Sequence, residues 1–138
     1  MIKIRFTIFL IMFGAPSIAQ EVTLDREVKM LALGDSYTIG ASVDINERWP
    51  HQLINEIRAM GFEGMDPDYI ATSGWTTQDL IQGINSMLDV EKSYNLVSIL
   101  IGVNNQYRRL SIDLYEPDLR KIVDLALGVF PARAAQAT

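Results

Sequence analysis

The stretch Met30-Leu31-Ala32-Leu33-Gly34-Asp35-Ser36-Tyr37-Thr38-Ile39-Gly40 holds the strongest indication of the fold, because its apolar run stops abruptly at polar residues. An apolar run bounded by glycine is typical of a buried strand. In an open α/β sheet, ligands bind at the C-terminal ends of the strands, so Ser36 lies where a nucleophile is useful. A Gly-Asp-Ser string is also a common turn, however. The choice between these two interpretations depends on residues farther along the chain.

Two more strands and three amphipathic helices are expected to follow this stretch in alternation. The expected strands cover 28–33, 69–72 and 96–103, and the expected helices cover about 49–60, 78–88 and 113–130. Thr76 or Thr77 is expected to cap the second helix. Strands that alternate with helices predict a parallel sheet with helices packed on it, which is the α/β class. Apolar residues at helical spacing predict the inner helix faces: Leu53, Ile54, Ile57 and Met60; Leu80, Ile81, Ile84, Met87 and Leu88; Leu119, Ile122, Val123, Leu125 and Ala126.

Polar residues follow all three predicted strands in a similar way. The first strand is followed by Gly34-Asp35-Ser36, the second by Ser73-Gly74, and the third by Gly102-Val103-Asn104-Asn105. Parallel strands of a doubly wound sheet end at the same edge, so these groups can converge. A serine hydroxyl, a glycine N–H and an asparagine amide are the groups needed to attack a carbonyl and to hold the resulting oxyanion. Their order and placement favour a functional site over three unrelated turns.

These three blocks resemble those of the SGNH hydrolases, also called the GDSL esterase/lipase family. The resemblance covers roughly residues 28–130, which correspond to the N-terminal part of the family's domain. It implies a flavodoxin-like three-layer α/β/α sandwich with a parallel sheet of strand order 2-1-3. It also implies that Ser36 is the nucleophile and that the oxyanion hole consists of the N–H groups of Ser36 and Gly74 and the amide of Asn104. Trp75 and Asn105 depart mildly from the family's pattern.

The family's catalytic Asp and His lie in an Asp-x-x-His block near the C-terminus, and no such block follows Asn105 here. The one histidine, His51, stands at the start of a predicted helix, where we expect an exposed residue and not a base for Ser36. The triad His and Asp are therefore absent from this chain. Residues 131–138 are expected to form an irregular tail.

The third predicted strand supports the same conclusion on physical grounds. Residues 96–101 form a nearly continuous apolar run, which is typical of a strand buried on both faces inside a sheet. With three strands in the order 2-1-3, this strand lies at an edge, which natural proteins avoid. We therefore expect that strands four and five of the sheet are missing. A truncation or frameshift explains this better than a naturally short domain.

The first 19 residues have the three-part layout of a secretory signal peptide. Lys3 and Arg5 form a basic head, residues 6–13 are almost wholly apolar, and Ser17-Ile18-Ala19 is a small-x-small cleavage site. The apolar segment is too short for a stable membrane anchor, which takes about 20 residues. The chain contains no cysteine, which suits a bacterial protein that is secreted or periplasmic and folds without disulfides. Its formal net charge of −5 disfavours nucleic acid as a partner.

Three functions remain open on this evidence. The first is a secreted serine ester hydrolase that acts on a small acyl or acetyl ester through an acyl-enzyme, and the second is an inactive fragment of that enzyme. The third is a non-catalytic module that binds a carbohydrate or carbonyl group. No residue cluster has metal-ligand spacing and no glycine-rich loop resembles a phosphate cradle, so no cofactor or metal is expected. Arg108 and Arg109 are expected to be solvated loop charges, whereas Trp75 either lines a pocket or packs beneath its loop.

Overall fold

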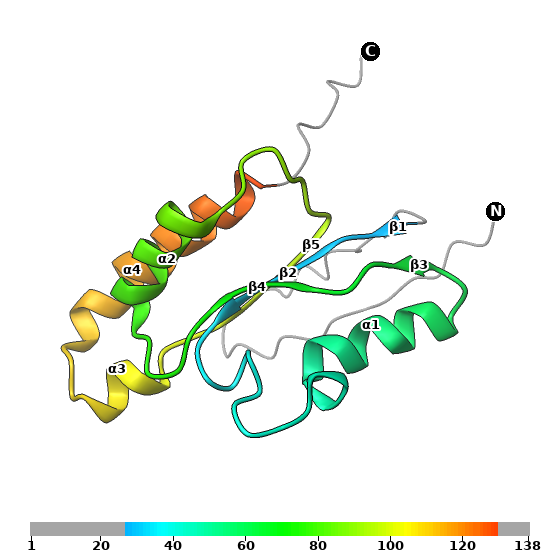
Figure 1. The fold of residues 1–138 in the computed structure, drawn as a ribbon. Helices are drawn as coiled ribbons and strands as arrows, with labels where there is room; N and C mark the ends of the chain where they lie inside the picture. Colours follow the sequence, from blue (N-terminus) through cyan, green and yellow to red (C-terminus); the bar gives the residue numbers. More distant parts are fainter. Residues whose placement is uncertain (1–26, 130–138) are drawn as a thin grey trace, which may run out of the picture.

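The computed structural model describes residues 27–129 (Figure 1). The signal peptide expected at 1–19 and the irregular tail expected at 131–138 lie outside these residues. Within the described part, no helix has the length and apolarity needed to cross a membrane. The elements are β1 (Glu27–Val28), β2 (Met30–Gly34), the 3-10 helix η1 (Ile45–Glu47), α1 (Trp49–Ala59), β3 (Glu63–Gly64), β4 (Asp68–Ala71), α2 (Thr77–Met87), β5 (Leu96–Leu100), α3 (Val103–Tyr107) and α4 (Ile112–Leu127).

The central sheet has three parallel strands in the order β4-β2-β5, which confirms the predicted order 2-1-3. In the middle strand, Leu31 pairs with Asp68 of β4 and with Val97 of β5. Every residue of β2 is buried, because the strand has a neighbour on each side and helices on each face. This explains why its sequence is a continuous apolar run and does not alternate. Strands β1 and β3 form a separate parallel pair.

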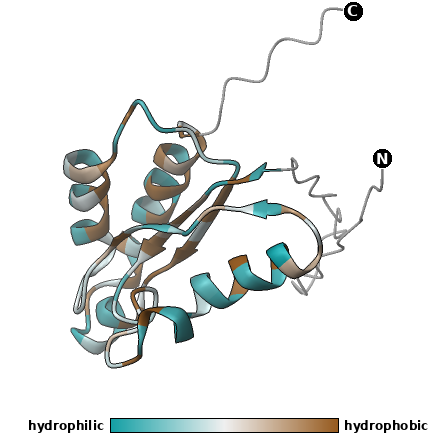
Figure 2. Ribbon diagram, turned by 45° about the vertical axis from the view of Figure 1, so that its right-hand side comes forward, coloured by the Kyte–Doolittle hydropathy of each residue, from teal (hydrophilic) through white to brown (hydrophobic). Residues whose placement is uncertain are grey.

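Helices cover both faces of the sheet, which confirms the three-layer α/β/α sandwich. Helices α2 and α4 lie together on one side of the strands and α1 lies on the other (Figure 1). Leu31 and Leu33 of β2 contribute to the core beneath α2 and α4, whereas Met30 and Ala32 contribute to the core beneath α1. This division follows from the two-residue period of a strand. The central strands are accordingly strongly hydrophobic in Figure 2.

The predicted apolar stripes of the helices were too wide. Four of their residues are exposed, at 37% for Leu53, 43% for Met60, 55% for Met87 and 39% for Val123. Each helix packs on the sheet through a narrow band, as Ile54 and Ile57 do in α1, and side chains beside that band face solvent. Apolar spacing shows that a helix has a buried side, but the packing partner decides how wide that side is.

The third strand is shorter than predicted, because β5 ends at Leu100 and residues 103–107 form the helix α3. Gly102 causes the change of direction, since its φ of +126° is incompatible with a continuing strand. A Cβ atom at this position would also lie 2.7 Å from the Tyr115 ring. In the described region β5 pairs only with β2, so it is an edge strand. Leu96 to Ile99 are half-buried and Leu100 is exposed.

Candidate active site

The loops that follow the three central strands meet at the C-terminal edge of the sheet. Asn104, which follows β5, connects them through its side-chain amide. Its Nδ2 donates to the Trp75 carbonyl oxygen at 2.8 Å and to Oδ2 of Asp35 at 3.3 Å. Trp75 follows Gly74 in the loop after β4, and Asp35 precedes Ser36 in the loop after β2. The three predicted site residues therefore belong to loops joined by one amide group.

A tight turn after β2 holds Ser36 at this edge. The backbone carbonyl of Asp35 accepts the N–H groups of Thr38 at 3.0 Å and Ile39 at 3.1 Å, and its carboxylate accepts the N–H of Tyr37 at 3.0 Å. Asp35 itself is 1% exposed, so the polar groups of this turn are directed inward around it. Ser36 is half-buried, and neither its N–H nor its hydroxyl has a hydrogen-bond partner among residues 27–129.

Gly74 occupies the loop after β4 for a conformational reason. Its φ is +83°, a region that favours glycine. A Cβ atom here would have Arg108 as its nearest neighbour at 3.6 Å, so the backbone angle and not the available space requires glycine. In the described part of the chain, the Gly74 N–H has no hydrogen-bond partner. The N–H groups of Ser36 and Gly74 are thus two backbone donors without a hydrogen-bond partner among residues 27–129.

Arg108 was predicted to be a solvated loop charge; its side chain is indeed 52% exposed, but it makes contacts that the sequence did not predict. Its Nη2 donates to the Gly74 carbonyl oxygen at 2.7 Å, and its Nη1 lies 4.0 Å from Oδ2 of Asp79. The contact depends on the fold, because α3 brings Arg108 back toward a loop 34 residues earlier in the chain. Arg108 therefore holds the Gly74 loop from its outer side. Arg109 is exposed, as expected.

Asn104 is close to the expected place, but its amide is already engaged. An amide nitrogen has two N–H groups, and here Trp75 and Asp35 supply an acceptor for both. Asn104 can donate to a ligand oxygen only after one of these bonds opens. The 3.3 Å bond to Asp35 lies beyond the usual range for N–H···O bonds and is the weaker of the two.

Trp75 packs against protein, which decides between the two alternatives left open by the sequence. A Cβ atom at Gly83 of α2 would lie 2.3 Å from the Trp75 ring, so the indole lies directly on that helix. The ring also packs against the hydrophobic core beneath α2 and α4. Trp75 therefore supports the Gly74 loop from the inside.

A buried polar network that the sequence analysis missed lies behind the site. Asn105 accepts the Thr77 N–H at 3.0 Å and donates to the Thr77 hydroxyl at 2.8 Å. That hydroxyl donates to Asp118 of α4 at 2.6 Å, and Gln78 also donates to the Asp118 carboxylate. The network joins α2, α3 and α4, and so fixes the helix that carries Asn104. One signal was present, since Asp118 lies four residues before Ile122 on the buried side of α4.

The helix that follows the Gly74 loop begins with a capping box at Thr76, one of the two predicted caps. The Thr76 hydroxyl accepts the Asp79 N–H, and Asp79 accepts the Thr76 N–H at 2.9 Å and its hydroxyl at 2.8 Å. The bond from the Thr76 N–H is the main reason why the pKa of Asp79 lies below its ordinary value of 3.8, and the bond from the Thr76 hydroxyl is the next. The charge of Arg108 also lowers this pKa.

Asp79→Asn should lower the free energy of unfolding at pH 7 by no more than about 1 kcal/mol, because the carboxylate is partly exposed and screened. A group whose pKa is lowered by folding stabilises the fold above its unfolded pKa, and this stabilisation disappears as the pH falls through the folded pKa. The difference between the two proteins should therefore begin to shrink near pH 3.8 and should vanish only below the lower pKa of the folded state. Urea unfolding at pH 7, 4 and 3 measures it. A difference that does not shrink between pH 7 and pH 3, or an equal effect of Asp124→Asn on the exposed side of α4, would contradict the assignment.

His51 was predicted to be exposed, and this was wrong. The residue is 8% exposed, its Nδ1 lies 2.7 Å from the Tyr69 hydroxyl, and the two rings stack with centroids 5.8 Å apart. The first turn of α1 faces β4 and is therefore not open to solvent, so Pro50 is buried as well. Burial raises the pKa of the Tyr69 phenol above its ordinary value of 10.0. Within residues 27–129, His51 makes no hydrogen bond to Ser36.

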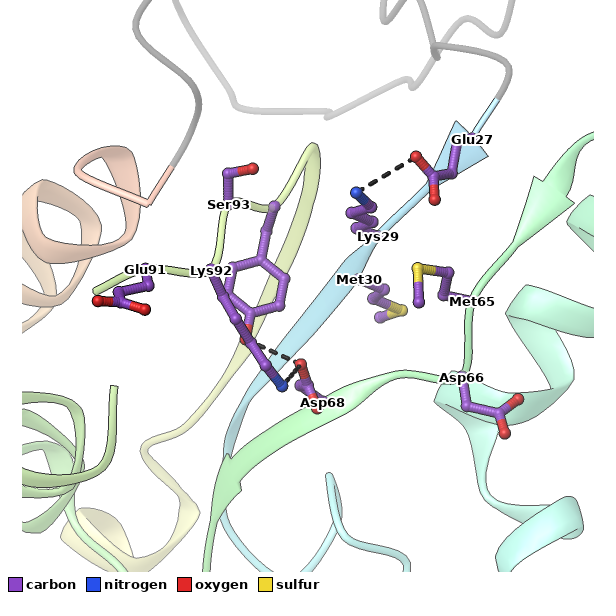
Figure 3. Close-up of a pocket in the computed structure, with 10 residues that line it drawn as sticks. Glu27, Lys29, Met30, Met65, Asp66, Asp68, Glu91, Lys92 and Ser93 are labelled. Atoms are coloured by element: carbon purple, nitrogen blue, oxygen red, sulfur yellow. Dashed lines mark hydrogen bonds and ion pairs between the residues drawn. The ribbon is translucent and has the colours of Figure 1, made fainter. Parts of the chain in front are cut away.

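A pocket lies at the opposite, N-terminal edge of the sheet and is separate from these residues (Figure 3). Lys92 Nζ and the Tyr94 hydroxyl both contact Oδ2 of Asp68 there, each at 2.9 Å. Lys29 is likewise paired with Glu27 at 3.2 Å, so both lysines of the pocket are neutralised by carboxylates that line it. In the part of the chain that the structure describes, no three His, Asp or Glu side chains form a group that could hold a metal ion. The lining residues are Glu27, Lys29, Met30, Met65, Asp66, Asp68, Glu91, Lys92, Ser93 and Tyr94.

Residues 32–135 match the family described as GDSL-like Lipase/Acylhydrolase. A search of curated protein sequences gives no significant match. Among solved structures, the chain is similar to AlinE4, an SGNH-hydrolase family esterase, with 27% identity and a TM-score of 0.62 over 73% of this chain and 53% of AlinE4.

Two further solved structures are similar in fold. TesA is 19% identical with a TM-score of 0.65, over 74% of this chain and 56% of TesA. The psychrotrophic esterase EstA from Pseudoalteromonas sp., in a structure inhibited by monoethylphosphonate, is 19% identical with a TM-score of 0.63, over 76% of this chain and 55% of EstA. The chain thus spans about half the length of the solved structures that it matches.

Proposed function

Because the chain belongs to the GDSL-like lipase/acylhydrolase family, we propose that it carries the nucleophile of a serine hydrolase for small acyl or acetyl esters. The Ser36 hydroxyl attacks the ester carbonyl carbon, the alcohol leaves, and water then releases the acid from the acyl-enzyme. One observation carries the proposal: the N–H groups of Ser36 and Gly74 have no partner among residues 27–129, at the edge of the sheet where Asn104 lies. We further propose that residues 1–19 direct the protein to the periplasm or the medium.

The two N–H groups suit an oxyanion hole for an energetic reason. Negative charge develops on the carbonyl oxygen during attack, and donors that are already oriented stabilise it without reorganisation. In this proposal the turn around Asp35 holds the first donor, and the left-handed backbone of Gly74 holds the second. In this proposal Asn104 adds a third bond by exchanging its long contact with Asp35 for the substrate oxygen.

We propose that the base which activates Ser36 is not among these 138 residues. A serine hydroxyl is a weak nucleophile without a base to take its proton. The chain has a single histidine, His51, and its Nδ1 is hydrogen-bonded to Tyr69. Since the chain spans about half the length of AlinE4, an Asp-x-x-His block in the remaining half of such a domain is the proposed source. The 138-residue chain by itself is then an inactive fragment.

Incubation of the purified chain with a fluorophosphonate probe tests this division of roles. We expect no stoichiometric labelling of Ser36, and at most the residual rate of about 10³–10⁴-fold over water that an oxyanion hole and binding can provide. Intact AlinE4 serves as the positive control. Stoichiometric labelling at neutral pH that Ser36→Ala abolishes would contradict the proposal, because it would demonstrate a base within the chain.

The alternative function is a module that binds a carbonyl group, including that of an acetylated sugar. The same two unpartnered N–H groups favour it, because they can hold a ligand oxygen without any catalytic base. Titration with acetate and with N-acetylglucosamine distinguishes the two functions. Saturable shifts of the Ser36 and Gly74 amide resonances, together with a lack of activity in every extended form of the protein, would favour binding over hydrolysis.

A further inference from the structure

The short helix α3 carries Asn104, and its own sequence is not sufficient to hold it in place. The helix has five residues and no side-chain cap at its N-terminus. Helices shorter than about 12–15 residues are marginal in water without tertiary contacts. Asn105 is the one buried residue of α3. The position of the neighbouring Asn104 amide therefore depends on what Asn105 binds.

The hydrogen bonds around Asn105 have directions that a backbone group fixes. The Thr77 N–H can only donate, and it donates to Oδ1 of Asn105 at 3.0 Å. The amide nitrogen of Asn105 is thereby turned toward the Thr77 hydroxyl, to which it donates at 2.8 Å. Because the hydroxyl accepts that bond, its own hydrogen is available for Oδ2 of Asp118 at 2.6 Å. The bonds thus run in one direction, from the Thr77 backbone through Asn105 to Asp118.

Asp118 ends this series because its side chain offers acceptors only. The Thr77 hydroxyl donates to one of its oxygens and the Gln78 amide donates to the other. Two donors need two acceptors, which a carboxylate supplies and an amide does not. Thr77 is 0% exposed and Asp118 is 7% exposed, so neither donor has ready access to bulk water as a substitute.

We propose that Asp118 is a positioning residue for the oxyanion hole and acts on Asn104 through Thr77 and Asn105. The start of α2 is the common reference for both asparagines. Asn104 donates to the Trp75 carbonyl oxygen two residues before α2 begins, and Asn105 binds Thr77, the first residue of α2. A Thr77 hydroxyl held by Asp118 therefore fixes α3 against the loop that Asn104 contacts. The inference rests on the proposed function, which makes Asn104 an oxyanion donor.

Positions 105 and 118 should then depend on each other. Asp118→Asn leaves one of the two buried donors without an acceptor. Asn105→Asp places a second carboxylate against the Thr77 hydroxyl, which can donate to only one of them. The double variant Asn105→Asp/Asp118→Asn reverses the series, because the hydroxyl then donates to position 105 and accepts from position 118. The amide oxygen at position 118 remains for Gln78. Each single variant should therefore lose order that the double variant regains.

The side-chain amide of Asn104 reports its own position in NMR spectra of the 138-residue chain. In Asp118→Asn and in Asn105→Asp its two proton resonances should move toward those of a solvated amide, and its hydrogen exchange should be at least about tenfold faster. In the double variant the exchange rate should return to within about twofold of the unmodified chain. Ile57→Val is the matched control, because it removes buried apolar volume beneath α1, on the other face of the sheet. It should leave the Asn104 resonances unchanged.

The rate of hydrolysis shows whether this position matters for the chemistry. In a chimera with the C-terminal half of AlinE4, Asp118→Asn should lower kcat about 10- to 100-fold and leave KM within about twofold. A displaced oxyanion donor weakens binding of the transition state and not of the substrate. Ile57→Val should leave both constants unchanged, because a general loss of stability does not move the donor.

Three results would overturn the inference. They are an Asn104 amide that is unaffected by Asp118→Asn, a double variant that is no better ordered than the single ones, and an Asp118→Asn chimera with unchanged kcat although Asn104→Ala is impaired. If Asn104→Ala itself leaves kcat unchanged, the proposed role of Asn104 is wrong. The inference then fails with that role, even where the NMR spectra agree with it.

Discussion

A chimera that joins this chain, after Val129, to the C-terminal half of AlinE4 should hydrolyse a short-chain chromogenic ester about 10⁴-fold faster than the 138-residue chain alone. The expectation follows from the site. Loss of the base costs a serine hydrolase about 10⁶-fold in kcat, whereas oxyanion donors remain useful without it. Here the donors of Ser36 and Gly74 are in place, and the one histidine is bonded to Tyr69. Supplying a base from the other half should therefore restore most of the rate.

Two variants of the chimera identify the groups involved. Ser36→Ala should reduce the rate to background and abolish labelling by a fluorophosphonate. His51→Phe should leave kcat within a few-fold, since His51 contacts Tyr69 and makes no hydrogen bond to Ser36 in the described region. A folded chimera that is inactive with Ser36 intact would contradict the role of Ser36 as nucleophile. Activity that survives Ser36→Ala would contradict it equally.

Gly34→Ala should lower the free energy of unfolding by at least about 4 kcal/mol, which is a large part of the stability of a small domain. A Cβ atom on Gly34 would lie 2.0 Å from Oγ1 of Thr38 and 2.4 Å from the Leu100 carbonyl oxygen. The second neighbour is backbone of β5, which is paired with Gly34 itself. Relief of the contact would have to separate β2 from β5 or break the turn that positions Ser36.

Gly61→Ala is a matched control for this variant. The φ of Gly61 is +90°, and a Cβ atom there would meet nothing within 4 Å. The cost at Gly61 is therefore only that of a left-handed backbone, about 1–2 kcal/mol. Urea unfolding followed by circular dichroism compares the two variants. A Gly34→Ala protein as stable as Gly61→Ala would show that the end of β2 tolerates a shift and that steric contact does not specify this glycine.

The sequence by itself determined the layered architecture and the edge of the sheet at which the polar loops lie. Both follow from local patterns, since a residue's face in a strand or helix depends on its position in a short period. The buried run of β2 and the capping box at Thr76 are consequences of such patterns. The order of the three strands was instead implied by the resemblance to the SGNH hydrolases.

Only the tertiary structure decided which polar groups at this edge are engaged and which are available. Asn104 with Asp35, Asn105 with Thr77 and Arg108 with Gly74 are separated by 69, 28 and 34 residues. His51 likewise became buried because α1 packs its first turn against β4. No local pattern encodes these pairs, because each depends on where two separately formed elements meet. The hydrogen bond that a side chain makes is set by the partner which packing brings within 3 Å of it.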